Sequence, residues 1–418
     1  MGFVRQDRDD GIHHHCGSAA SQRSRHLDCP SGIQRVLDQS DDLRNRRNFD
    51  GRRRPFQCVD HASRNAPVRN MKVLHICDHP PFGGAFVASQ SVVDLVGGSV
   101  FRNQKPSAWV QAWATIGGYC LRSEKKRVTS LIRAHNPDIV HLHNFKEFGT
   151  AAIASAKQEG VPAIWSCYDY WPLCPRDNFH GPDCAVDRCR ISCYNPRDRR
   201  LPVLSKLPLL GRKRRITRWM NELDGIIALS SAAETILIEG GIGVPDAEKN
   251  QKTHIIPLPI TLPEAIEVER NENLVAFVGG NPKNKGRSVF FEVEALVRKK
   301  RPAAEFHEIK ADSRLGALKA IATAKVLVVP ELWPNPGPVV VVEAALLGTK
   351  VVATDVGGIR ETTERYSEAG FAQTNDAMLF ANEIVRCLDA KTDPRPGPDL
   401  PKIKEQLLEV YECAVRRA

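Results

Sequence analysis

Short apolar runs alternate with longer amphipathic stretches along most of the chain after residue 70. Runs of four to eight apolar residues closed by polar, Gly or Pro residues are typical of strands buried on both faces. In the first half the predicted strands are 73–77, 138–143, 162–167, 224–229 and 253–258. The helices predicted between them are 85–95, 125–135 and 151–159. Regular alternation of strand and helix predicts a parallel sheet covered by helices.

The same alternation returns in the second half, after a linker at 259–273 that is rich in Pro and Glu. The predicted strands are 274–278, 304–309, 325–329 and 350–354, and the predicted helices are 315–324, 339–347, 377–388 and 400–417. The pattern therefore predicts two doubly wound α/β domains, at 71–262 and 270–418. Residues 99–118 are poorly patterned, so the first domain looks shortened by a strand–helix unit.

Composition places the chain among globular proteins. Its 418 residues, 42% of them hydrophobic, suffice for two cores, and the net charge is +10. No apolar run approaches the roughly 20 residues of a membrane span, and Met1 does not open a signal peptide pattern. We therefore expect a cytoplasmic protein whose twelve cysteines are thiols or metal ligands rather than disulfides.

Residues 1–70 differ from the rest of the chain. They contain thirteen Arg and no Lys, nine Asp and no Glu, and no lasting apolar period. A basic arm that binds nucleic acid is one interpretation, but the interleaved Asp residues weaken it, and we expect no nucleic-acid partner. The residue bias favours a disordered or spurious extension, with Met71 as a plausible start.

The most informative stretch is 330–354, which reads as a loop, a helix and a strand after the strand at 325–329. Its Pro- and Gly-rich loop follows the carboxyl end of a strand, where open α/β sheets bind ligands. Glu343 lies inside the apolar helix, where a carboxylate is costly without a partner. Either Glu343 holds a sugar hydroxyl pair, such as a ribose diol, or it lies on an exposed helical face.

This segment resembles the donor-site motif of the retaining family 4 glycosyltransferases, the glycosyl transferases group 1 of GT-B fold. That motif has two glutamates with seven residues between them and then a phrase like the one at 348–361. Glu343 matches the second glutamate, which holds the donor's ribose, and the first falls on Asn335. Pro338 stands where the family has Gly or Pro, and Val339 follows it as a further donor-binding position. The resemblance implies two Rossmann-like domains that face each other across a cleft, with helix 400–417 crossing back to the first.

Glycine-rich loops supply the expected diphosphate site. Gly279 and Gly280 open a loop that ends in Lys285, which matches the family's Lys, and cations beside a helix N-terminus favour phosphate. An exposed turn with solvated lysines is the alternative. Further backbone amides are expected from two Gly pairs, Gly83 with Gly84 and Gly357 with Gly358.

The first domain carries candidate sugar-binding residues. The stretch at 136–143 resembles a PDIVHxH signature, and His141 and His143 point to one face of a strand, either as a metal pair or as packed histidines. Tyr168 and Asp169 stand at a His-Asp-Tyr phrase of the family, and the resemblance places them in the sugar pocket. Tyr168 is able to donate a hydrogen bond to a sugar oxygen.

Two further segments invite alternatives. Four cysteines form a local cluster within an insertion at 174–193: Cys174, Cys184, Cys189 and Cys193. They are either a structural zinc site or thiols or disulfides, since their spacing lacks a CxxC pair.

The stretch 197–220 is basic with interspersed apolar residues, which suits peripheral contact with the inner membrane face or a solvated helix.

The function implied is transfer of a sugar, with retention, from a UDP- or GDP-sugar donor to a glycan, lipid-linked or small acceptor. Lys285, Glu343, Asp169 and Tyr168 are the expected catalytic group, and no cofactor or divalent metal is required. A non-catalytic nucleotide- or partner-binding relative is the alternative, since Tyr168, Gly280 and Asn335 depart from the family pattern. A Rossmann oxidoreductase is disfavoured because no GxGxxG follows the first strand.

Overall fold

The computed structural model describes residues 71–417 apart from short gaps at 79–82, 103–106, 178, 180–206, 208, 244–252, 264–265, 280–283, 367–369, 373–375 and 392–395. All of these described residues belong to the compact unit Arg54–Ala418. The interpretation of residues 1–70 as an extension lies outside the described residues.

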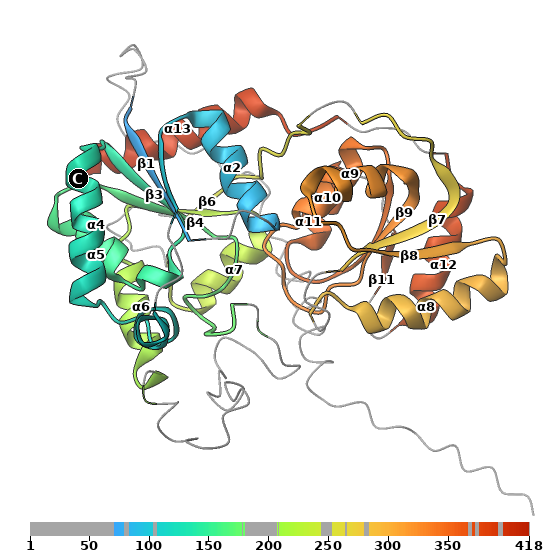
Figure 1. Cartoon of the computed structure of the whole chain (residues 1–418), viewed down its shortest axis with the longest axis horizontal. Coiled ribbons are helices and arrows are strands. Elements are labelled where there is room, and N and C mark those ends of the chain that lie inside the picture. The colour runs from blue at the N-terminus through green and yellow to red at the C-terminus, as the bar shows by residue number, and fades with distance from the viewer. Residues whose placement is uncertain are drawn as a thin grey trace, which may run out of the picture. The chain divides into compact units, whose positions relative to one another are not determined.

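The first domain is built on a six-stranded parallel sheet of order β2-β1-β3-β4-β5-β6 (Figure 1). Its strands are β1 Val73–Cys77, β2 Ser99–Arg102, β3 Ile139–Asn144, β4 Ala163–Ser166, β5 Gly225–Ala228 and β6 Thr253–Ile255. Its helices are α2 Gly84–Val96, α3 Ala108–Val110, α4 Arg122–His135, α5 Ala151–Gln158, α6 Arg212–Met220 and α7 Ser231–Glu239, with single turns at η3 Gln111–Ile116 and η4 Lys146–Phe148. The inner strands β1, β3 and β4 are fully buried, although β1 carries one histidine and β3 carries two histidines and an asparagine among their apolar residues.

The second domain is built on a five-stranded parallel sheet of order β11-β10-β9-β7-β8. Its strands are β7 Asn271–Val278, β8 Glu305–Ile309, β9 Ala324–Val329, β10 Lys350–Thr354 and β11 Gly370–Ala372. Its helices are α8 Arg287–Lys300, α9 Arg314–Thr323, α10 Val339–Leu346, α11 Ile359–Tyr366 and α12 Ala377–Asp389. The two sheets confirm the prediction of two parallel α/β domains.

The last helix, α13 Leu400–Arg417, packs on the first domain (Figure 1). Ile403, Leu407 and Tyr411 share a core cluster with Val73 of β1 and Ile139 of β3. The chain therefore ends by burying an apolar helical stripe against the sheet with which it began. No helix among the described residues is long and apolar enough to cross a membrane.

Two parts of the fold differ from the sequence pattern. Residues 99–118, which carry little periodicity, form the edge strand β2, the short α3 and the π-helical turn η3. The residues of β2 are exposed or half-buried, so no unbroken apolar run marks it. The elements α11 and β11 were also not predicted; they are short, with eight and three residues.

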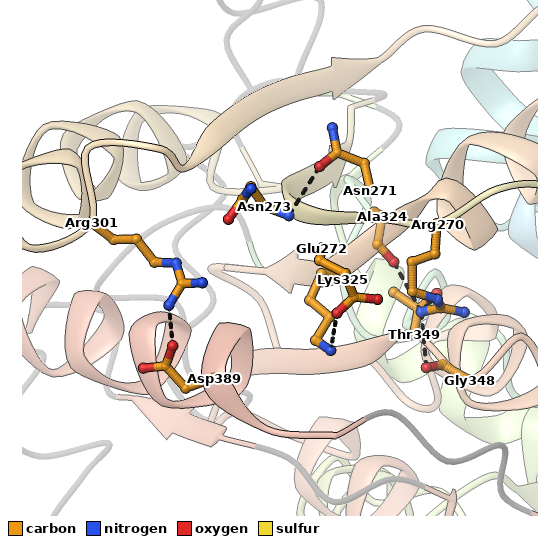
Figure 2. Close-up of polar contacts among 10 residues, drawn as sticks. All are labelled: Arg270, Asn271, Glu272, Asn273, Arg301, Ala324, Lys325, Gly348, Thr349 and Asp389. Atoms are coloured by element: carbon orange, nitrogen blue, oxygen red, sulfur yellow. Dashed lines mark hydrogen bonds and ion pairs between the residues drawn. The ribbon is translucent and has the colours of Figure 1, made fainter.

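Arg270 ties the linker to the amino-terminal edge of the second sheet (Figure 2). Its guanidinium donates hydrogen bonds to the carbonyl oxygens of Leu347 at 2.7 Å, Gly348 at 3.0 Å and Ala324 at 3.1 Å. The first two carbonyls lie at the end of α10, where a cation offsets the negative end of the helix dipole. Nearby, Lys325 pairs with Glu272, and Arg301 pairs with Asp389. The Arg270 contacts fix the start of β7 relative to the end of α10.

A substitution at Gly286, the residue that precedes α8, tests how tightly the loop beside Lys285 is packed. Gly286 has φ 72°, and a Cβ there would overlap the carbonyl oxygen of Pro330. Gly286→Ala is expected to lower the free energy of unfolding by more than about 2 kcal/mol, because strain and overlap add. Gly160 has φ 67° with open space around it, so Gly160→Ala is the control and should cost about 1–2 kcal/mol. Equal losses in urea denaturation would show that the Pro330 contact is not tight.

Candidate active site

A cavity of about 830 Å³ opens at the carboxyl ends of strands from both sheets. Loops that follow parallel strands meet along one rim, which is why residues distant in sequence gather there. The predicted residues that line it are Gly83, Gly84, Tyr168, Asp169, Gly279, Lys285, Asn335, Pro338, Val339 and Glu343. Gly280 lies outside the described residues.

Glu343 is buried on α10, so the exposed-face interpretation is wrong. Its Oε1 accepts a hydrogen bond from Arg314 Nε at 3.0 Å, and Arg314 also donates to the carbonyl oxygen of Thr261 at 2.8 Å. Burial raises the pKa of Glu343, while Arg314 acts in the opposite direction. Arg314 was not predicted from the sequence, because it is the first residue of the helix α9 and no recognisable motif surrounds it. It supplies the partner that a carboxylate at this place needs.

Glu331 is a second buried carboxylate of the cavity, with 2% of its surface exposed. It forms an ion pair with Lys285, and its Oε2 accepts a hydrogen bond from Asn335 Nδ2 at 2.8 Å. Glu331 was not predicted from the sequence, because it lies four residues before Asn335, the position that aligns with the family's first glutamate. A carboxylate is therefore present beside Asn335, but it comes from position 331 and not from position 335.

The loop that carries these residues is held by hydrogen bonds on both sides. Asn335 Oδ1 accepts from the Gly337 amide at 3.1 Å, and Thr354 Oγ1 donates to the Glu331 carbonyl at 2.8 Å. Ser230 Oγ, from the first domain, donates to the Pro336 carbonyl at 2.8 Å. Since the backbone is fixed at several points, the cavity wall is built before any ligand enters.

Gly357 and Gly358 do not line the cavity, in contrast to their predicted donor-binding role. A Cβ at Gly357 would lie 2.6 Å from the backbone of Pro334. The Gly358 amide donates to the Asn335 carbonyl at 2.8 Å and so is already occupied. This Gly pair instead allows the strand end to pack behind the 331–338 loop.

Glu361, in the same sequence phrase, links the two domains. Its carboxylate accepts hydrogen bonds from the backbone amides of Ser231 at 2.8 Å and Ala232 at 2.9 Å, the first residues of α7. Carboxylates are favoured at helix N-termini, where unpaired amides and the helix dipole point outward. The GGIRE phrase therefore holds a helix of the first domain in place beside the cavity.

Tyr168 and Asp169 follow β4 and reach the cavity from the first domain. Asp169 accepts from Asn144 Nδ2 at 3.1 Å and from the Trp171 amide at 2.8 Å, which fixes its carboxylate. The Tyr168 hydroxyl lies 2.9 Å from His143 Nδ1 and is directed into the sheet. The Tyr168 hydroxyl thus points toward His143, whereas the sequence led us to expect it to face a sugar.

His141 and His143 are buried in the sheet and lie beside a third histidine, His75 of β1. All three are fully buried, and one ligand nitrogen from each lies within 4.8 Å of the others. Of the predicted cysteine cluster, Cys174 is buried beside the Tyr170 turn, while Cys184, Cys189 and Cys193 lie outside the described residues.

Asp78 directly follows the last residue of β1 and was not predicted as a site residue. It is buried, and its Oδ2 accepts from the Glu147 amide at 2.8 Å. Burial raises the pKa of Asp78 to about 7, and this amide and Lys146 only partly offset the effect. Lys146 also forms an ion pair with Asp177 at 2.7 Å. Acidic groups thus cluster at the carboxyl end of the first sheet, next to Asp169.

Two family models match the chain, one on each domain. The model of Glycosyltransferase Family 4 matches residues 112–262, and the model of Glycosyl transferases group 1 matches residues 259–396. A protein of Klebsiella pneumoniae, described as an uncharacterized 42.6 kDa protein in the cps region, is 25% identical over 284 residues. That alignment covers 62% of this chain and 69% of the relative.

Solved structures show the same fold at low sequence identity. HepE of Anabaena, crystallised with UDP, is 15% identical with a TM-score of 0.51, over 82% of this chain and 100% of that chain. The catalytic domain of starch synthase IV from Arabidopsis thaliana, bound to ADP and acarbose, is 12% identical with a TM-score of 0.52, over 83% and 100%. The two parallel sheets and the likeness to these structures show a GT-B fold. Within that class, the two family models place the chain among the family 4 glycosyltransferases.

Asp78 gives the site a testable pH dependence. Its native pKa of about 7 exceeds the ordinary value of 3.8, so between these values the native state holds a proton that the unfolded state has released. This costs the parent stability as the pH rises through the window. Asp78→Asn, which cannot ionise, should gain about 1.4 kcal/mol per pH unit relative to the parent between pH 4 and pH 7.

The measurement is urea unfolding of both proteins at several pH values. Asp94→Asn, at an exposed position of α2, is the control and should give a flat difference. A flat difference for Asp78→Asn as well would mean that native Asp78 is ionised across this range.

Proposed function

We propose that this glycosyltransferase takes its sugar from a nucleotide-sugar donor bound in the cavity and transfers it with retention of configuration. The observation that carries the proposal is that Lys285 and Glu343, 58 positions apart, line one cavity at the carboxyl ends of parallel strands. A nucleotide-sugar offers a diphosphate to the first and a ribose diol to the second. The UDP of the Anabaena structure and the ADP of the starch synthase support a nucleotide donor.

The diphosphate would be held by Lys285 and by backbone amides. Gly83 and Gly84 stand at the N-terminus of the 13-residue α2, whose dipole favours an anion there. In the absence of donor, Lys285 is paired with Glu331. Binding would therefore move its ammonium group, or share it, between Glu331 and a phosphate oxygen. Stabilising the departing diphosphate in this way is the main catalytic contribution we assign to the protein.

Glu343 would bind the ribose with Arg314 as its fixed partner. Because Arg314 already holds Oε1, the carboxylate is oriented before the ligand enters. Asp169, fixed by Asn144 and Trp171, would face the sugar. The reaction as proposed needs no divalent metal. Zinc at Cys174, Cys184, Cys189 and Cys193 would be structural only, and its presence is open to elemental analysis.

A non-catalytic donor-binding relative is the second candidate, favoured by Asn335 and Tyr168. Glu331 weakens that alternative, since it returns a carboxylate to the Asn335 side chain. Transfer or hydrolysis of a nucleotide-sugar by the purified protein distinguishes the two. The acceptor we propose is a glycan or lipid-linked saccharide of polysaccharide biosynthesis, in line with the cps-region relative.

Loss of donor binding in two variants tests the proposal. Glu343→Ala and Lys285→Ala should each weaken nucleoside diphosphate binding by about ten- to a hundredfold, the effect of one charge-assisted hydrogen bond. Calorimetry with UDP and GDP measures the affinity and reads out the base preference. Lys299→Ala, on the exposed end of α8, is the charge-matched control. Unchanged affinity in both site variants would refute the donor site.

We infer that the enzyme contacts an anionic membrane surface through α6 and the turn before it. Leu207 and Leu210 are 40% and 59% exposed, and Lys213, Arg214 and Arg218 are exposed on α6. Exposed apolar residues beside cations suit the interface of an anionic bilayer. Buried Arg212 is excluded from this surface, because it donates to the carbonyl oxygens of Ile116, Trp171 and Pro172.

Charge reversal tests the membrane contact. The double variant Lys213→Glu and Arg214→Glu should bind vesicles of one part phosphatidylglycerol to two parts phosphatidylcholine at least about tenfold more weakly, since each cation contributes about 1 kcal/mol. Lys402→Glu with Lys404→Glu, on the exposed face of α13, makes the same charge change elsewhere. Equal loss in both double variants, measured by sedimentation, would point to net charge rather than to this surface.

A further inference from the structure

The first sheet contains a buried row of polar side chains. His75 on β1 pairs in register with His141 on β3, and His143 follows on the same strand. All three imidazoles are fully buried. A buried ring nitrogen without a partner costs free energy, so the partners of each nitrogen decide what the row does.

Every ring nitrogen of the three histidines has a partner. His75 Nε2 lies 2.9 Å from the Gly97 carbonyl oxygen, and His75 Nδ1 lies 2.8 Å from His143 Nε2. His143 Nδ1 lies 2.9 Å from Tyr168 Oη. The Tyr168 hydroxyl is also hydrogen-bonded to the Ser166 side chain. The row continues from Ser166 Oγ to His141 Nε2 at 2.8 Å and from His141 Nδ1 to Tyr411 Oη at 2.8 Å.

The Gly97 carbonyl fixes the direction of this chain of hydrogen bonds. A carbonyl oxygen only accepts, so His75 Nε2 must carry the proton and donate it. Neutral His75 then has a bare Nδ1, which must accept from His143 Nε2. His143 Nδ1 is bare in turn and must accept from the Tyr168 hydroxyl. Beyond Tyr168 the same rule makes Ser166 donate to Tyr168, His141 to Ser166 and Tyr411 to His141.

The direction requires neutral histidines, and burial supplies this for two of them. It lowers the pKa of His75 to about 4 and holds the pKa of His141 well below its ordinary value. Near neutral pH the rings of His75 and His141 therefore each have one donor and one acceptor nitrogen. With His143 neutral as well, which the NMR experiment below tests, the hydrogen bonds assign all three rings the tautomer with the proton on Nε2.

A metal ion is the alternative to a hydrogen-bonded row of three clustered histidines, and one observation opposes it. The His75 and His143 nitrogens that would face the ion are 2.8 Å apart, a hydrogen-bond distance with a proton between them.

The chain of hydrogen bonds passes the cavity at Tyr168. The Tyr168 hydroxyl donates to His143 and faces Ser166, whereas its ring packs with Val87, Leu229 and Val339 on the cavity side. At the Gly97 end of the chain, Gly98 has φ 122°, and a Cβ there would lie 3.1 Å from the His75 ring. The ring of His75 is thus backed by the main chain and has little freedom to turn.

We propose that His75 and His143 are positioning residues for Tyr168, which meets the donor's sugar with ring carbons and without a hydrogen bond. This rests on the proposed function, because the contact concerns the sugar of the donor.

The tautomers are measurable without any donor. The full-length chain labelled with 15N in its imidazoles is examined by NMR, with signals assigned by single His→Gln variants. His75, His141 and His143 are expected as Nε2-protonated neutral rings from pH 6 to pH 8, with exposed His135 as the reference. Any of the three found with its proton on Nδ1, or charged in this range, would overturn the one-way chain.

The effect on sugar recognition is measured as the ratio of UDP-glucose to UDP affinity, using these two ligands as probes. His143→Leu breaks both bonds of His143, so the ratio should change by about fivefold or more while the affinity for UDP stays the same. His143→Gln keeps an acceptor toward Tyr168 and a donor toward His75, and it should restore the ratio. A purely structural role would lower the melting temperature and leave the ratio unchanged, which would contradict the proposal.

Two Tyr168 variants separate the ring from the hydroxyl. Tyr168→Ala should lower the ratio by about tenfold through loss of the ring surface. Tyr168→Phe removes the same hydrogen bond as His143→Leu, so it should lower the ratio by about as much, and the double variant should lose no more than either single variant. A clearly larger loss in the double variant would show that the hydroxyl itself reaches the sugar. Stoichiometric zinc or nickel in the purified protein that is lost in His143→Leu would favour the metal instead. If the parent binds neither UDP nor UDP-glucose, the proposed donor site is refuted for these two ligands. The NMR experiment still tests the direction of the hydrogen-bond chain, because it needs no donor.

Discussion

The buried carboxylate of Glu331 is the constraint on which the geometry of the cavity depends. A carboxylate with 2% exposure requires partners, and it takes Lys285 from the loop after β7 and Asn335 from the loop after β9. These partners come from neighbouring strands of one sheet, so satisfying a single charge sets the distance between two loops. The Asn335 side chain in turn accepts a hydrogen bond from the Gly337 amide, and the Asn335 carbonyl oxygen accepts one from the Gly358 amide. Burial of one charge thereby organises the wall that faces the ligand.

The same logic applies around Glu343. Glu343 is buried in an apolar helix and is held by Arg314, which is itself held by the Thr261 carbonyl in the linker. The cavity is thus lined by two ion pairs, Glu331 with Lys285 and Glu343 with Arg314. Each pair keeps a charged group oriented in a place of reduced solvation, where rearrangement upon binding is small. The protein surface around them contributes little to this arrangement, because exposed ion pairs are weak.

The first domain uses neutral polar groups where the second uses charges. Its central strands carry three histidines whose nitrogens are all partnered, and Tyr411 from the last helix completes the row. A long-range contact between residues 141 and 411 therefore joins the end of the chain to the core of its first sheet. Partnered polar groups in a core favour one arrangement over others, since any slip leaves several of them unpaired.

The sequence by itself determined the two parallel α/β domains, because unbroken apolar runs followed by amphipathic stretches allow few other folds. It also determined which loops form the cavity, since Lys285 and Glu343 follow strands whose carboxyl ends share a rim. The edge strand β2 was missed because edge strands lack a two-sided apolar run. Which partner each buried charge takes was decided only by the tertiary structure. Glu331, Arg314 and the direction of the Tyr168 hydroxyl depend on atoms from distant segments meeting within hydrogen-bond distance, and local sequence does not encode that meeting.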